Sequence, residues 1–398
     1  MKIYMNLIFS KNTIIEIIIA LAFFILFNKF IFIALISILL FLVYQSNKTS
    51  NFPLPKELEN LKMKAFLENP KNTSKLMKDK FIFEDKVDIP HLKSENDILV
   101  KIYSSALNQV DYIYQFSQFP LIRWFKMSHF GVGMDFSGKI LQVGKNVTKY
   151  KIGDEVFGFA KGGSLQEYTL TNENIIFKKP DSISFNEISA LPSCFGTAYR
   201  SLTYNFGTDV KNKKVLIVGC SGGIGIFAIQ ISKYLNFEKI VGVCSSRNKN
   251  LVESYGVDEV LCYDKENYIN DCKEKFDLIF DNVSSPESGL QYEKYKVLLK
   301  HYVGEYIVIN GTFKQKILGA LQLLIGKKFK IEPDHFHFNF GSQDSKFLEI
   351  GSKMINEKKL RVLYEPHNFD KKEIISCYEV IESRRTKGKL VIEIKKSD

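Results

Sequence analysis

The segment Lys214-Val-Leu-Ile-Val-Gly-Cys-Ser-Gly-Gly-Ile-Gly225 decides the fold of this chain. After its lysine, residues 215–218 form an uninterrupted apolar run, as expected for a parallel strand that is buried on both faces. Apolar residues then recur at helical spacing from Ile224 to Leu235. A strand, a glycine-rich turn and a helix in this order predict the first unit of a Rossmann-type sheet.

The glycine spacing has a physical reason in such a unit. Gly219 permits the tight turn, Gly222 lets the backbone approach a pyrophosphate, and Gly225 allows the helix to pack closely on the strand. The free N–H groups at the start of the helix then attract the anion. We therefore predict that the loop binds a nicotinamide dinucleotide; the alternative is a glycine-rich turn without a ligand. The predicted loop contacts are Gly219, Ser221, Gly222, Gly223, Ile224 and Gly225.

The end of the next strand, residues 239–244, indicates which dinucleotide is bound. An NAD-specific site carries Asp or Glu at this point to bind the ribose 2′-hydroxyl. The chain instead continues with hydroxyl and basic side chains, which can hydrogen-bond and neutralise a 2′-phosphate. They are Ser245, Ser246, Arg247 and Lys249. The sequence therefore predicts NADPH, unless this segment is an exposed basic turn of no consequence.

Further elements complete the predicted sheet. A helix over 247–255 and strands over 259–263, 276–280 and 305–310 follow. Strands that alternate with helices predict an α/β fold with a doubly wound parallel sheet. Asn282 and Asn310 follow two of these strands at their carboxyl ends, where ligands bind in such sheets. We therefore add both asparagines to the predicted cofactor site.

The N-terminal segment differs in composition from the rest. Residues 13–44 are nearly all apolar, which suits one tilted membrane span or two short segments hinged at residues 28–29. No small-residue cleavage site follows, so a signal peptide is a poor alternative. More lysines follow the span than precede it, which favours a cytoplasmic catalytic domain. We predict a membrane protein with a transmembrane anchor over 1–46 and a linker over 47–77; the organelle stays open.

Composition excludes several classes of protein. The net charge of +11 comes almost entirely from lysines spread along the chain, not from clustered Arg and aromatic residues, so we predict no nucleic-acid partner. The six cysteines include no CxxC pair and no spacing typical of a zinc site. Several lie in apolar runs, as free buried cysteines do. This pattern indicates a reduced protein without a disulfide framework.

A series of short motifs before the glycine loop points to a family. The motifs are Ala106-Leu-Asn-Gln-Val-Asp111, Gly133-Met-Asp-Phe-Ser-Gly138, Gly153-Asp-Glu-Val-Phe-Gly158, Ala190-Leu-Pro192 and Thr197-Ala-Tyr199. Together they resemble the medium-chain dehydrogenase/reductase superfamily, in particular its zinc-free quinone oxidoreductase branch, which includes the reticulon-interacting mitochondrial oxidoreductases. The resemblance covers about residues 80–398. It implies a GroES-like β-barrel domain over 78–187 and 330–398, with a Rossmann domain over 188–329 between them.

The resemblance also bears on zinc. Zinc alcohol dehydrogenases of this superfamily have a cysteine at the start of the segment that begins here with Asn108, and a His-Glu pair in place of Met134 and Asp135. Neither thiolate nor imidazole is available at these places, so we predict no metal. Without a Lewis acid, hydride adds most easily to conjugated carbonyls, whose product anion is stabilised by resonance. We therefore predict a zinc-independent, NADPH-dependent oxidoreductase that reduces lipophilic quinones or α,β-unsaturated carbonyl compounds at a membrane.

The resemblance further implies individual site residues. Asn108 and Tyr112 are the candidate catalytic residues, and Asp111 braces their loop. Tyr114 is the alternative proton donor, and a packing role for either tyrosine stays open. Thr197 and Tyr263 are implied on the nicotinamide and adenosine sides of the cofactor site.

Two departures from the family keep a rival function open. Gln109 replaces the usual proline, and the aromatic segment 115–125 is longer than a simple loop. This segment could be a lid over the acceptor, a membrane patch or ordinary packing. The rival is a membrane-bound scaffold or trafficking factor on the same fold with little or no turnover. A homodimer also stays open, because enzymes of this branch are often dimers and no sequence feature decides it.

Overall fold

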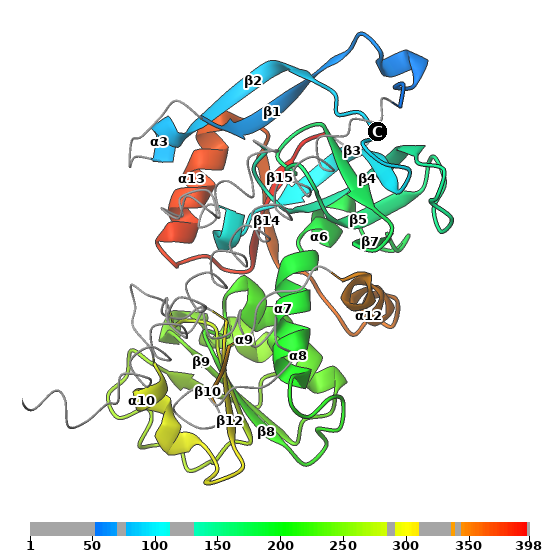
Figure 1. The fold of residues 1–398 in the computed structure, drawn as a ribbon. Helices are drawn as coiled ribbons and strands as arrows, with labels where there is room; N and C mark the ends of the chain where they lie inside the picture. The colour runs from blue at the N-terminus through cyan, green and yellow to red at the C-terminus, as the bar shows by residue number, and fades with distance from the viewer. Residues whose placement is uncertain are drawn as a thin grey trace, which may run out of the picture. The chain divides into compact units, whose positions relative to one another are not determined.

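The computed structural model describes residues 52–69, 77–111, 131–284, 291–309, 336–338 and 344–395. The chain divides into two units, residues 1–52 and 53–398, and every element described below belongs to the second. The strands of this unit form two large sheets and one sheet of two strands (Figure 1).

The first large sheet contains six strands that all run parallel. They are β8 (Lys214–Val218), β9 (Lys239–Cys244), β10 (Glu259–Cys262), β11 (Leu278–Asp281), β12 (Glu305–Val308) and β13 (Phe336–Phe338). The spatial order is β10-β9-β8-β11-β12-β13, so the strand order reverses between β8 and β11. This is the order of a doubly wound dinucleotide-binding sheet, and it confirms the predicted α/β fold.

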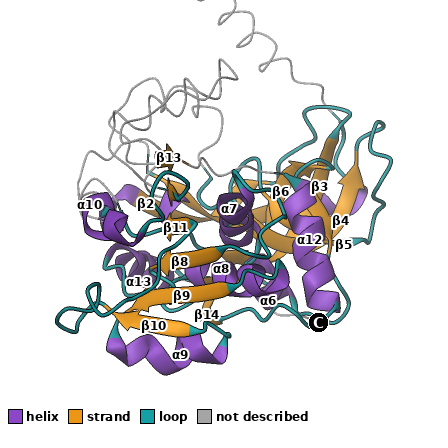
Figure 2. Cartoon of the chain, turned by 90° about the horizontal axis from the view of Figure 1, so that it is seen from below, coloured by secondary structure: helices purple, strands orange, loops and turns teal. Residues whose placement is uncertain are grey.

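Two separate cores explain the apolar run of β8. Val215 and Ile217 belong to a core cluster shared with α7 and α8, whereas Leu216 and Val218 belong to a second cluster shared with α10. Alternate residues of a strand face opposite sides of the sheet, so both faces of β8 are buried. Figure 2 shows β8, β9 and β10 side by side, with α9 next to β10. The helices and 3-10 turns of this part are α7 (Pro192–Thr203), α8 (Gly223–Tyr234), η2 (Ser246–Asn248), α9 (Lys249–Ser254), α10 (Tyr292–Tyr295) and η3 (Lys296–Leu298).

The second large sheet contains seven strands and joins distant parts of the sequence. They are β3 (Asp97–Ala106), β4 (Asp135–Val143), β5 (Glu155–Phe159), β6 (Tyr168–Asn172), β7 (Ile176–Lys178), β14 (Tyr364–Asn368) and β15 (Lys389–Glu393). β15 pairs antiparallel with β3, so the C-terminal segment returns to a sheet that begins near residue 97. This is the GroES-like part of the fold. Helices α6 (Phe185–Ser189) and α13 (Lys371–Glu382) pack against strands of this sheet, whereas α12 (Ser345–Asn356) contacts both β7 and α7.

A two-stranded sheet replaces part of the predicted linker. It consists of β1 (Lys62–Glu68) and β2 (Phe81–Asp88), and β1 lies within residues 47–77. Lys62 and Lys64 are exposed residues of β1 and alternate with buried apolar ones. A half-buried strand therefore explains the lysines as well as a linker does. The short helices here are η1 (Lys56–Leu58) and α3 (Met77–Lys80).

The predicted membrane location with a cytoplasmic catalytic domain is wrong. The longest helices of the described ranges have 12 residues. Such a helix is about 18 Å long, whereas a bilayer core is about 30 Å thick. Within those ranges, no helix has the length and apolar character needed to cross a membrane. Residues 1–46, on which the transmembrane prediction was based, lie outside the described residues.

Candidate active site

The glycine loop between β8 and α8 has the geometry that its sequence predicts. Gly219 has φ +77°, in the left-handed region that favours glycine. A Cβ on Gly225 would lie 2.4 Å from the Gly219 carbonyl oxygen, so α8 approaches the loop too closely there for any side chain. A Cβ on Gly222, in contrast, would meet no atom of the described residues nearer than 3.6 Å. The packing of the described residues therefore does not require Gly222, as expected for a glycine that admits a ligand.

The turn after β11 packs against this loop. Asp281 is fully buried and accepts hydrogen bonds from Tyr306 Oη at 2.5 Å and from the N–H groups of residues 283 and 284 at 2.9 and 3.0 Å. Burial, and then the Asp281 charge, raise the pKa of Tyr306, so its hydroxyl stays a donor. These bonds hold the turn so that Asn282 Oδ1 lies 2.9 Å from the place of a Cβ on Gly219.

Asn282 also offers a donor to a ligand. Its Nδ2 is buried and has no hydrogen-bond partner among the described residues. A buried donor left unpaired is destabilising unless a bound molecule accepts its hydrogen bond. Asn282 follows β11 at the point where the strand order reverses, which is where doubly wound sheets bind ligands. The loop and this turn therefore fit a dinucleotide.

The far end of the predicted cofactor site contains an acid that the sequence analysis missed. Ser246 donates its N–H to the two carboxylate oxygens of Asp264, at 2.9 and 3.1 Å, and its hydroxyl to one of them at 2.8 Å. These bonds lower the pKa of Asp264, so it is charged at neutral pH. The family motif covers only the end of the second strand, β9. Asp264 follows β10, which pairs in parallel with β9, so the ends of the two strands lie side by side. The residues after the third strand were therefore the part of the sequence that could have revealed this acid.

The other predicted residues of this end lie around the same strand ends. Ser245 is buried; Arg247, Lys249 and Tyr263 are exposed. Asn248, which the sequence analysis did not single out, donates from Nδ2 to Ser221 Oγ at 3.1 Å and so joins the turn after β9 to the glycine loop.

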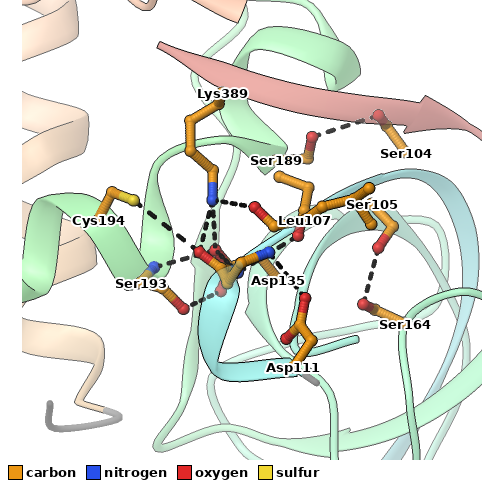
Figure 3. Close-up of polar contacts among 12 residues, drawn as sticks. Ser104, Ser105, Leu107, Asp111, Asp135, Ser164, Ser189, Ser193, Cys194 and Lys389 are labelled. Atoms are coloured by element: carbon orange, nitrogen blue, oxygen red, sulfur yellow. Dashed lines mark hydrogen bonds and ion pairs between the residues drawn. The ribbon is translucent and has the colours of Figure 1, made fainter. Parts of the chain in front are cut away.

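A second group of side chains comes from four distant parts of the chain (Figure 3). We call it the Lys389 cluster, and its members are Asn108, Asp135, Ser193, Cys194 and Lys389. Lys389 Nζ donates to the Leu107 carbonyl at 2.6 Å and to Asn108 Oδ1 at 2.5 Å, and lies 4.0 Å from Asp135 Oδ2. Asn108 Nδ2 donates to Asp135 Oδ2 at 3.0 Å. Ser193 donates its hydroxyl and its N–H to Asp135, at 2.5 and 3.2 Å.

Two buried carboxylates give this region its electrostatics. Burial raises the pKa of Asp135, and Lys389 opposes that rise. Burial also raises the pKa of Asp111 to about 7. Asp111 Oδ2 accepts from the Asn108 N–H at 2.8 Å and from Tyr378 Oη at 3.4 Å, while Oδ1 is buried without a partner among the described residues. Asp111 therefore holds the Asn108 loop, as a brace would, and exchanges a proton near neutral pH.

The Lys389 cluster is in contact with the glycine loop. Gly388 forms an isolated parallel bridge with Gly222. A Cβ on Gly223 would lie 2.9 Å from Lys389 Cδ and 3.4 Å from Cys194 Sγ. The loop predicted to bind a dinucleotide and the residues predicted to face an acceptor are thus neighbours in one site.

The remaining predicted residues divide into two groups. Thr197 is half-buried on α7, four residues after Ser193 and so on the same helix face, and Ile224 packs against the main core. Tyr112, its alternative Tyr114, Asn310 and the aromatic segment 115–125 lie outside the described residues.

The side chains of the Lys389 cluster do not fit a zinc ion. Asn108 presents an amide, and its oxygen accepts a hydrogen bond from Lys389. A protonated lysine has no lone pair for a metal and repels a cation. Burial raises the pKa of Cys194, which favours the thiol over the thiolate that zinc needs. In the described ranges, no three His, Cys, Asp or Glu side chains are grouped so that they could hold a metal.

Comparison with known families gives two matches along the chain. Residues 94–181 match the alcohol dehydrogenase GroES-like domain, and residues 255–392 match the zinc-binding dehydrogenase family. The first match covers strands β3 to β7 of the seven-stranded sheet, and the second covers β10 to β13 of the parallel sheet together with β14 and most of β15.

Individual relatives cover most of the chain. The trans-enoyl reductase pgmF of Aspergillus terreus is 30% identical over 322 residues, which are 75% of this chain and 86% of the relative. The mitochondrial NAD(P)H oxidoreductase RTN4IP1 of Danio rerio is 27% identical over 347 residues, 77% of this chain and 86% of the relative. By its name this relative is mitochondrial, unlike the cytoplasm-facing membrane protein that the N-terminal sequence predicted.

Among solved structures, the quinone oxidoreductase from Coxiella burnetii is similar, with a TM-score of 0.68 and 23% identity. The similarity covers 84% of this chain and 99% of that one. At this identity the likeness establishes the fold alone.

Proposed function

Because the chain belongs to the medium-chain dehydrogenase/reductase superfamily, among its quinone-oxidoreductase-like members, we propose that it is an NADPH-dependent, zinc-independent reductase of quinones or α,β-unsaturated carbonyl compounds. In this proposal residues 188–329 bind the cofactor, and residues 78–187 and 330–398 hold the acceptor. One observation carries it: the Gly222–Gly388 bridge brings a dinucleotide-type loop against a buried polar cluster.

The cofactor side of the proposal depends on the loop and the two strand ends beside it. NADPH, when bound, supplies the hydride. Gly222 and the first N–H groups of α8 would hold the pyrophosphate, and Asn282 would donate from Nδ2, which has no partner in the described part of the chain. Arg247 and Lys249 favour a 2′-phosphate, whereas the Asp264 charge opposes one. We therefore propose that the site prefers NADPH over NADH and that the Asp264 charge weakens this preference.

On the acceptor side, the contacts of Asn108 revise its expected role. Its Nδ2 donates to Asp135 and to the Ala106 carbonyl, at 3.0 and 3.3 Å, so both of its amide hydrogens are used within the protein. We propose that Asn108 shapes the acceptor pocket instead of donating to the acceptor oxygen. Tyr112 stays the proposed proton donor.

The acceptor class follows from the chemistry that these side chains can support. No zinc Lewis acid is proposed here, so an isolated ketone would be reduced slowly. In a quinone or an enone, hydride addition gives an anion that resonance already stabilises. The protein then has to hold the two reactants in alignment and to exclude water. The name of the trans-enoyl reductase supports the second of these acceptor classes.

The test uses the purified full-length chain with NADPH, NADH and a panel of quinones and enones. We expect cofactor oxidation, followed by absorbance, with at least one acceptor class, and the same rate after dialysis against a chelator. Cofactor binding without oxidation across the panel would overturn the reductase proposal in favour of the scaffold. A rate that is lost with the chelator and restored by zinc would overturn zinc independence alone.

A further inference from the structure

Lys389 is a buried cation that no step of the proposed chemistry has used. Its side chain is 4% exposed, although lysine is rarely buried without a partner. Two of its three N–H donors are directed at the Leu107 carbonyl and at Asn108 Oδ1. Asp135 Oδ2 lies 4.0 Å from Nζ, and the Cys194 thiol makes a further polar contact with Lys389. A buried ammonium thus lies in the site beside a carboxamide, a carboxylate and a thiol.

The surroundings of Lys389 explain why the charge is tolerated there. Asp135 is completely buried and lies beside it, so the two charges compensate each other. The aliphatic part of Lys389 packs against Gly223 of the glycine loop, where a Cβ would lie 2.9 Å from Cδ. The charge is consequently held at the boundary between the cofactor loop and the Asn108 side chain.

We propose that Lys389 is the fixed cation of this active site: it positions the Asn108 carboxamide, balances Asp135, and supplies the positive charge that a metal ion would otherwise provide. This inference rests on the proposed reductase function. Hydride addition to the conjugated carbon of the acceptor leaves a negative charge on its oxygen, and a proton from the proposed donor, Tyr112, then neutralises that oxygen. A fixed cation nearby stabilises the anion as it forms. Lys389 is thus a positioning residue that acts through Asn108 and through its charge.

Lys389→Met is the primary test, because methionine keeps an aliphatic stem against Gly223 and removes the charge. With full-length protein and NADPH, we expect kcat to fall by about 100-fold, as for loss of an oxyanion donor. The NADPH dissociation constant should change by less than about threefold, because the contact with the loop is retained. Lys389→Arg should recover part of kcat. An unchanged kcat in Lys389→Met, or no recovery in Lys389→Arg, would overturn the proposal.

A matched control comes from Lys179. Its side chain is 7% exposed, donates to the carbonyls of Pro180 and Ile183 and pairs with Glu155 at 3.1 Å, so it is a buried paired lysine outside this site. Lys179→Met should lower stability without lowering kcat. Equal losses of kcat in the two variants would reduce Lys389 to a structural role.

A stability measurement separates this inference from the proposed function. Lys389→Met leaves the Asp135 charge buried without compensation, which is strongly destabilising. The double variant Lys389→Met/Asp135→Asn removes that charge, so its urea midpoint should exceed that of Lys389→Met. This result with no turnover in the wild type would mean that the reductase proposal alone fails. A double variant no more stable than Lys389→Met would overturn the charge balance, whatever the activity.

Discussion

The glycine loop and the Lys389 cluster are in contact, yet the sequence encodes them in opposite ways. The loop is seven consecutive residues, 219–225, whose spacing states its own geometry. The cluster collects side chains from β4, α7, β15 and the loop after β3, across almost three hundred positions. The loop depends on backbone shape, whereas the cluster depends on buried charge. A motif can therefore reveal a binding surface long before it reveals the polar groups that face it.

The largest expected effect concerns charge next to the cluster. Burial raises the pKa of Asp111 from 3.8 to about 7, so the folded protein holds a proton there between those pH values and the unfolded chain does not. This group adds stability that is fully present below about pH 4 and is lost as pH rises through about 7. Asp111→Asn removes the titration. At pH 8 the variant should be more stable than the wild type, by at most ~4 kcal/mol.

Urea unfolding at several pH values between 4 and 8 measures how the free energy of unfolding of each protein changes with pH. The expected result is a shallower decline of stability with pH in Asp111→Asn. Parallel curves for the two proteins would show that the Asp111 proton is not linked to folding. The stability of the region around the Lys389 cluster would then depend on packing, like that of the glycine loop, and not on the Asp111 charge.

The second prediction tests the loop with two glycines. Gly225→Ala places a Cβ 2.4 Å from a backbone oxygen and should lower stability by ~2 kcal/mol, with loss of cofactor binding. Gly222→Ala meets only ordinary contacts and should fold as well as the wild type. It should nevertheless raise the NADPH dissociation constant about 100-fold, or ~2.7 kcal/mol, because the methyl group excludes the pyrophosphate.

Thermal unfolding and fluorescence titration with NADPH separate these two losses. Normal NADPH affinity in Gly222→Ala would remove the pyrophosphate from this loop. Reduced stability of Gly222→Ala would instead indicate that Gly222 is needed for packing, which its contacts in the described residues do not predict.

The same contrast explains how much could be predicted. Strands β8 and β9 begin and end where their apolar runs predicted, since local sequence decides them. The resemblance also placed Asn108 and Asp135 at the two positions where the zinc enzymes of the family have metal ligands, which implies that they lie close together. It gave no sign that Lys389 would join them, because a lone lysine in a returning strand has many possible neighbours until β15 pairs with β3. Asp264 was missed for a related reason: the motif follows one strand, whereas the proposed site lies at the ends of two neighbouring strands.

A smaller effect is expected where the loop depends on a buried hydrogen bond. Tyr306→Phe removes one of the donors to Asp281 and should reduce stability by about 2 kcal/mol. Because Asp281 holds the turn that carries Asn282, NADPH affinity should also fall several-fold. Tyr295→Phe is the matched control, since it breaks the Tyr268–Tyr295 hydroxyl contact in the same core. The control should lose stability and keep its cofactor affinity. Equal losses of NADPH affinity in the two variants would show that Asp281 has no specific role in cofactor binding.

The smallest effect concerns cofactor choice at the end of the site that the motif described least well. Asp264 accepts three hydrogen bonds from Ser246, so its negative charge lies where a 2′-phosphate is proposed to bind. Asp264→Asn keeps an acceptor for Ser246 and removes the charge. The ratio of NADPH to NADH affinity should rise about tenfold, or ~1.4 kcal/mol, and less at high salt because exposed charges are screened. Glu266→Gln makes the same change of net charge two residues away and should leave the ratio unaltered. If both variants shift the ratio equally, only the overall charge matters, and the strand end after β9 selects the cofactor without Asp264.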